Sequence, residues 1–135
     1  MKKQYTAAIL TVVAAATVFG IGGSGFTRVA CAADPPTSFQ EDVLPVFQVR
    51  CVSCHSPNGE GFKASGLDLT TYQGVVAGTK FGPMVVPGDP DSSNLMRLLD
   101  WRVPAQLRMP HNKKQLSVCD RNAIRSWIRQ GAKDN

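Results

Sequence analysis

Cys51-Val52-Ser53-Cys54-His55 is the stretch of this chain around which the fold must be built. Two thiols three positions apart, followed directly by an imidazole, form the C-x-x-C-H pattern that attaches a c-type haem. On one helical turn the sulfurs of Cys51 and Cys54 can reach the two vinyl groups of a porphyrin and bond to them as thioethers. The same turn aims a ring nitrogen of His55 at the iron. The motif therefore predicts one covalent haem c with His55 as the proximal ligand.

Two other kinds of site use a C-x-x-C pair. A zinc site needs a second pair of ligands, and the remaining cysteines, Cys31 and Cys119, are far apart in the sequence. A thioredoxin-like redox pair belongs near a βαβ unit, and the sequence shows no alternation of strands and helices. The sequence favours haem attachment over both.

The first 33 residues have the three-part layout of a secretory signal peptide. A positive start at Lys2 and Lys3 precedes an apolar, Ala/Val-rich run over 6–25. Small residues suited to a cleavage site then follow at Ala30, Ala32 and Ala33. We expect residues 1–33 to be removed and residues 34–135 to form the mature protein.

Two other fates of this segment remain open. It could be retained as a membrane anchor, although the run of about 20 residues is near the minimum for a span and is rich in glycine. It could also carry a lipid on Cys31, although Arg28 stands where such a signal has an apolar residue. Export agrees with the haem motif, because bacteria form the thioethers outside the cytoplasmic membrane. We therefore expect a periplasmic protein, with membrane association only if the N-terminus is retained.

The mature chain has the size and charge of a single small domain. Removing the three basic residues of the signal peptide from the 15 in the chain leaves 12, against 10 acidic residues. Because of this balance and the absence of a basic run, we expect no nucleic-acid partner. A domain of this size buries a limited core, so a haem would form much of its interior. We expect the haem-free chain to fold poorly.

Helix signals lie on both sides of the motif. Ser38 followed by Glu41 is a capping box that predicts a helix running to the motif, interrupted or restarted at Pro45. Ser117 followed by Asp120 is a second capping box, and it predicts the last helix.

Between these helices the pattern is more irregular. The polar, Gly-rich stretch 56–66 predicts a loop. Thr71 to Gly78 predicts a short helix, and the cap residues 91–93 predict another with Leu95 and Leu99 on one face. Residues 102–114 predict a second irregular stretch. Nothing in the sequence indicates a sheet, so the fold class is mainly α.

Four residues after the motif could bind the second face of the iron. A thioether sulfur suits a low-spin electron carrier and raises its reduction potential. Met96 lies between apolar helix positions, which favours a core role. Met84 and Met109 lie in loops, and Pro110 restrains the backbone beside Met109. His111 is flanked by polar residues that indicate a solvated position.

Several motifs, taken in their order along the chain, resemble those of the planctomycete-type cytochrome c domain, a branch of the class I cytochrome c fold. The residues that carry the resemblance are Phe39, Asp42-Val43-Leu44-Pro45-Val46-Phe47, Cys51-x-x-Cys54-His55, Gly66-Leu67-x-Leu69, Pro87-Gly88-Asp89-Pro90, Ser93-x-Leu95, Met109-Pro110, Leu116-Ser117 and Trp127-Ile128-x-x-Gly131-Ala132. The resemblance implies that residues 34–135 are a monohaem domain of helices wrapped around one haem. It also implies that the first and last helices cross, and that Met109 is the distal ligand.

The resemblance implies an electron carrier that is not an enzyme. We expect single-electron transfer between transient redox protein partners, with no small-molecule substrate. A fixed haem relay subunit of a membrane-bound oxidoreductase is the first alternative. A ligand-binding haem sensor is the second, which the available methionine ligand disfavours.

Cys119 is left over in this interpretation. With Cys31 removed and the motif cysteines bonded to haem, it has no partner within the chain. We therefore expect a free thiol in the first turn of the last helix, with an intermolecular disulfide as the alternative.

Overall fold

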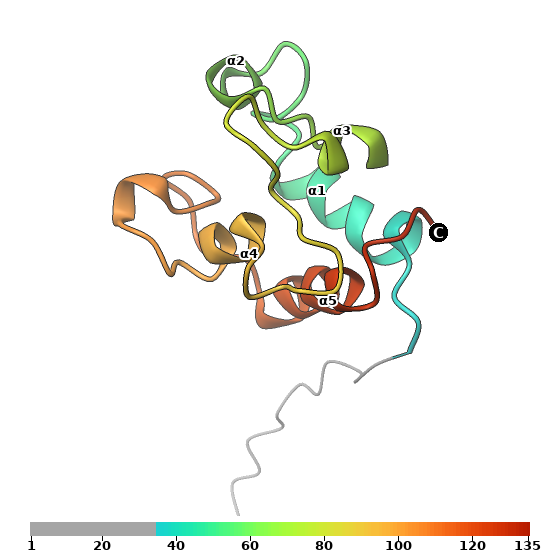
Figure 1. Ribbon diagram of the computed structural model, residues 1–135. Helices are drawn as coiled ribbons and strands as arrows, with labels where there is room; N and C mark the ends of the chain where they lie inside the picture. The colour runs from blue at the N-terminus through green and yellow to red at the C-terminus, as the bar shows by residue number, and fades with distance from the viewer. Residues whose placement is uncertain (1–34) are drawn as a thin grey trace, which may run out of the picture.

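The computed structural model describes residues 35–135, and the predicted signal peptide at 1–33 lies outside them. The described chain is helical (Figure 1), and its only β-pairing is an isolated bridge between Thr79 and Gly82. No described helix has the length and apolar character needed to cross a bilayer. The elements are η1 (Phe39–Val43), α1 (Leu44–Arg50), α2 (Glu60–Ser65), α3 (Tyr72–Ala77), α4 (Asn94–Leu99), η2 (Ala105–Leu107) and α5 (Val118–Arg129). The mainly α prediction is confirmed.

The first predicted helix forms as two segments. The Ser38 hydroxyl caps η1, a π-helical turn, by accepting a hydrogen bond from the Glu41 N–H at 3.1 Å. The reciprocal bond is made by Asp42, whose carboxylate accepts from the Ser38 N–H at 2.8 Å, and not by Glu41. The α-helix restarts at Leu44, with Pro45 in its first turn, where a missing N–H costs no helical hydrogen bond. The restart at the proline is confirmed.

The loop predicted over 56–66 is wrong in its second half, where α2 forms. The glycines that indicated a loop flank this helix: Gly59 is its N-cap, and Gly66 is its C-cap at φ +79°. A glycine tolerates that left-handed conformation without a steric cost. An ion pair between Lys63 and Glu60 at 2.8 Å bridges one turn of the helix.

The other helices agree with the sequence. Thr71 caps α3 through the Gly74 N–H, and Gly78 ends it. Ser93 precedes α4, and η2 is a short turn within the stretch predicted to be irregular. Ser117 and Asp120 form both bonds of the predicted capping box of α5.

The two ends of the described chain lie side by side (Figure 1). Aromatic side chains form the contact between them. Phe39 of η1 lies 5.3 Å from both Trp127 of α5 and Tyr72 of α3, measured between ring centroids. The Trp127 indole N–H donates to the Lys133 carbonyl at 2.7 Å. Buried aromatic rings with a satisfied polar atom contribute strongly to a small core. The crossing of the first and last helices is confirmed.

The segment between α3 and α4 crosses the molecule from α2 to α5 (Figure 1). The Gly88 N–H donates to the Ile128 carbonyl of α5 at 2.8 Å, and the Leu95 N–H donates to the Met84 carbonyl at 2.9 Å. These bonds and the buried side chains of Met84 and Val85 fix the segment as a wall of the core.

A cluster of charges joins α4 to α5. Asp100, the C-cap of α4, has a side chain that is 14% exposed, and it pairs with Arg121 and Arg125 of α5. Arg102 also approaches it, at 3.7 Å. Since one carboxylate neutralises several guanidinium groups here, its removal would leave like charges close together in a partly buried setting.

We predict that Asp100→Asn lowers the free energy of unfolding by about 2 kcal/mol, because the arginines lose their counter-charge. Denaturant titration followed by circular dichroism measures the change. The matched control is Asp91→Asn, whose carboxylate is 78% exposed and pairs with two of the same arginines. That change should cost less than about 0.5 kcal/mol, and equal losses in the two variants would contradict the prediction.

Candidate haem site

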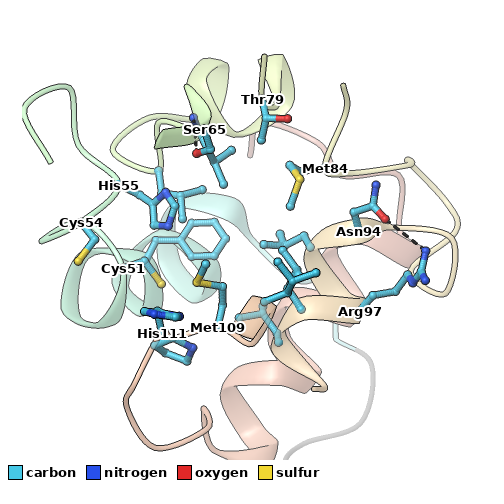
Figure 2. A pocket seen from close by; sticks show the side chains of 18 of the residues that line it. Cys51, Cys54, His55, Ser65, Thr79, Met84, Asn94, Arg97, Met109 and His111 are labelled. Carbon is cyan, nitrogen blue, oxygen red and sulfur yellow. Dashed lines mark hydrogen bonds between the residues drawn. The ribbon is translucent and has the colours of Figure 1, made fainter. Parts of the chain in front are cut away.

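The four residues predicted to bind haem line a single cavity of about 500 Å³ (Figure 2). Cys51, Cys54 and His55 come from the end of α1, and Met109 comes from the loop before α5. Among the described residues that line this cavity, none carries a carboxylate. Much of its wall is apolar, formed by Phe47, Leu67, Leu69, Pro83, Met84, Leu95, Leu98 and Leu99. The cavity has the size and lining of a site for an apolar cofactor.

The motif is held as a tight turn directly after α1. The Cys51 N–H donates to the Phe47 carbonyl at 2.8 Å, and the His55 N–H donates to the Cys51 carbonyl at 2.9 Å. Outside the turn, the Phe62 N–H of α2 donates to the Cys54 carbonyl, and the Leu69 N–H donates to the His55 carbonyl. The turn is therefore fixed against two later segments of the chain.

The His55 imidazole has the character of a neutral metal ligand. Burial lowers its pKa below the usual 6.5, and the backbone of Leu67 only partly opposes this effect. Its Nδ1 atom is buried without a hydrogen-bond partner among the described residues. A neutral imidazole has a lone pair available for a metal. An unpaired ring nitrogen on a residue that lines this cavity therefore fits haem iron.

Gly61 is a part of the site that the sequence interpretation missed. A Cβ at this position would lie 2.8 Å from His55 Cε1, 2.9 Å from His55 Nε2 and 2.9 Å from the Cys54 carbonyl oxygen. Only a glycine lets α2 approach the imidazole this closely. The sequence signal was present, as a glycine six residues after the histidine, but it was interpreted as part of a loop.

The two motif cysteines are free thiols that line the cavity. Burial raises the pKa of the Cys51 thiol to about 11, against the opposing effects of Arg50 and Lys113. Catalytic dithiols depend on a lowered thiol pKa, so this environment is unlike that of a thioredoxin-type pair. The motif also follows an α-helix, not a strand. Within residues 35–135 no group of three or more His, Cys, Asp or Glu residues is arranged to hold a metal ion.

The loop that carries Met109 is anchored to α4 by its backbone. The Met109 N–H donates to the Leu98 carbonyl at 3.2 Å, and the Trp101 indole N–H donates to the Met109 carbonyl at 3.0 Å. The Arg108 guanidinium lies over the Trp101 ring, 5.2 Å from its centroid. The Met109–Pro110 peptide bond is cis. Met109 is half-buried on the cavity wall, in a restrained loop.

The other candidate ligands fall in three different places. Met96 is fully buried in the core and does not line the cavity, so the core role expected for it agrees with the structure. Met84 lines the cavity on the side of Thr79 and Asn94, away from the cysteines (Figure 2). His111 is exposed, as expected, but it also lines the cavity beside Met109.

Cys119 departs from the expectation of a free thiol. It lies in the first turn of α5 and is disulfide-bonded. The expectation assumed that Cys31 is removed with the signal peptide and that both motif cysteines are bonded to haem. The residues around Cys119 carry no information on either assumption.

Comparisons with known proteins give one family and one relative. Residues 51–112 match the family described as Planctomycete cytochrome C. Hydrazine synthase subunit alpha of Kuenenia stuttgartiensis is a relative, 27% identical over 121 residues. The match covers 70% of this chain, and the chain spans only 15% of that protein's length. No solved structure matches the chain.

The matched segment begins at Cys51 and includes both motif cysteines, His55 and Met109. It therefore contains each residue predicted to bind the haem, and such a family implies a c-type cytochrome with haem c. The resemblance noted in the sequence is confirmed over residues 51–112, which match the planctomycete cytochrome c family.

Proposed function

We propose that this chain is an exported monohaem c-type cytochrome that transfers single electrons between redox proteins. The observation that carries the proposal is the convergence of Cys51, Cys54, His55 and Met109 on one cavity of about 500 Å³ with a largely apolar wall. The haem iron, when bound, supplies one-electron chemistry by cycling between its ferrous and ferric states. The periplasmic location rests on the predicted signal peptide and on the site of thioether formation.

Cys51 and Cys54 would hold the cofactor by two thioether bonds. Each thiol would add across one vinyl C=C bond, with its sulfur bonded to one carbon and its hydrogen to the other. This addition balances without an oxidant or a reductant. The two sulfurs lie on one turn after α1, and both line the cavity, which agrees with attachment along one edge of a porphyrin.

His55 would hold the iron through an imidazole nitrogen, and Met109 through its thioether sulfur. The unpaired Nδ1 and the lowered pKa of the imidazole support His55. The two backbone anchors of Met109 support the methionine, because a restrained loop loses little entropy on binding. An iron that held both of these ligands would favour electron transfer over substrate binding. We therefore propose a carrier that is not itself an enzyme and has transient protein partners.

The relative named above supports a second candidate function. Hydrazine synthase subunit alpha is, by its name, part of an enzyme, and 15% of its length matches this chain. The chain could then be a fixed haem relay within an oxidoreductase complex. Size-exclusion chromatography of the protein from its native source distinguishes the two functions, because a relay stays with a larger complex and a diffusing carrier elutes alone.

We predict that Met109→Ala abolishes the methionine–iron charge-transfer band of the oxidised protein. The reduced variant should also bind carbon monoxide readily, because one face of the iron is open. Absorption spectroscopy measures both effects. Met84→Ala is the matched control, since Met84 lines the same cavity on its far side, and it should keep the band. Loss of the band in Met84→Ala alone would transfer the assignment to Met84.

We predict that Gly61→Ala displaces the His55 ring and lowers the free energy of unfolding of the holoprotein by about 1–3 kcal/mol. The added Cβ would lie under 3.0 Å from the ring and from the Cys54 carbonyl oxygen. Thermal unfolding and the haem absorption spectrum report the two effects. The control is Ala64→Ser, at an exposed position of the same helix, and it should change neither the stability nor the spectrum. A Gly61→Ala protein with unchanged stability and an unchanged spectrum would refute the contact.

We predict that the double variant Cys51→Ala, Cys54→Ala fails to retain haem and loses most of its helical circular dichroism. The physical reason is that the cavity walls then have no cofactor to bury them. A native-like far-ultraviolet spectrum in the haem-free protein would contradict this. Ser53→Ala, between the two cysteines and exposed, is the control and should keep both haem and fold.

A further inference from the structure

Three cationic side chains line the cavity: Arg50, Arg97 and Lys113. Among the described lining residues there is no carboxylate to neutralise them. A cation with no carboxylate beside it, at one end of a cavity with a largely apolar wall, is suited to a ligand that is apolar over most of its area and anionic at the edge near that cation.

Two of these cations belong to the cysteine end of the cavity. Arg50 immediately precedes Cys51, and its guanidinium donates to the Lys114 carbonyl at 3.2 Å. Both Arg50 and Lys113 act electrostatically on the Cys51 thiol. They therefore lie near the edge at which the thioether bonds would form.

Arg97 lies at the other end. Figure 2 shows Arg97 and Asn94 across the cavity from Cys51 and Cys54, and side chains that are separated in a projection are also separated in space. Both come from α4, and the Arg97 guanidinium approaches the Asn94 side-chain oxygen at 3.5 Å. Within residues 35–135 no ion pair joins Arg97 to an Asp or Glu side chain. Its charge is thus available to a ligand.

The propionate carboxylates of a haem are anions that match this cation. The porphyrin carries its two vinyl groups along one edge and its two propionate carboxylates along the opposite edge. Bonds from Cys51 and Cys54 to the vinyl groups would therefore direct the carboxylates toward the end of the cavity where Arg97 lies. A guanidinium binds a carboxylate through two parallel hydrogen bonds, which a lysine ammonium cannot reproduce.

We propose that Arg97, assisted by the Asn94 amide, binds the haem propionates and so positions the cofactor edge opposite the cysteines. This inference rests on the proposed function, because it requires covalent haem at Cys51 and Cys54. Arg97 is a positioning residue: it binds the edge of the cofactor and not the iron. Its positive charge also stabilises the reduced state, whose net charge is one unit more negative than that of the oxidised state.

The test is the propionate bending band in the resonance Raman spectrum of the purified holoprotein, because its frequency responds to hydrogen bonding at the carboxylates. Arg97→Gln should shift this band and lower the midpoint reduction potential. Arg97→Lys should restore most of the potential while leaving the band shifted, since it keeps the charge and loses the paired hydrogen bonds.

Lys113→Gln is the matched control, since Lys113 is an exposed cation that lines the cavity at the cysteine end. It should leave the propionate band in place, although the loss of charge also lowers the potential. A band that shifts in Lys113→Gln and not in Arg97→Gln would overturn the proposal. A failure of the proposed function itself would be distinguishable. If that function is wrong, the wild-type protein will show no covalent haem in its pyridine haemochrome spectrum.

Discussion

The contact between Phe39 and Trp127, with ring centroids 5.3 Å apart, is the interaction on which the rest of the structure depends. It joins η1 to α5, and η1 continues through α1 into the cysteine turn. On the other side, α5 holds α4 through Asp100, and α4 anchors the Met109 loop. One aromatic contact between the ends of the described chain thus sets the two walls of the cavity relative to each other.

The electrostatics of the cavity depend on the absence of carboxylates among its described lining residues. The described lining residues include three cations and no carboxylate, and burial lowers the pKa of the His55 imidazole. In such surroundings a charge interacts over a longer range than in water. A redox cofactor held here would have its potential set by a few fixed groups: the sulfur ligand, the surrounding apolar side chains and the cations at either end. This environment agrees with a one-electron carrier, and it offers no carboxylate as a general acid or base.

Local signals predicted much of the fold. Ser38, Thr71 and Ser117 cap the helices that were expected to begin after them, because a cap depends on a few neighbouring residues. The same local reasoning missed α2, since the glycines that flank a short helix look like those of a loop. It also failed for Cys119, which is disulfide-bonded.

The sequence by itself predicted the chemistry of attachment, because the spacing of Cys51, Cys54 and His55 lies within one turn and needs no other segment; its further motifs carried the family resemblance. Only the tertiary structure decided which of the later residues reach that turn. Met109 and Met84 line the cavity while Met96 is buried in the core, Gly61 packs on the imidazole, and Arg97 lies opposite the cysteines. These placements depend on how α2, α4 and the loops pack against α1 and α5, and such long-range packing leaves no periodic trace in the sequence.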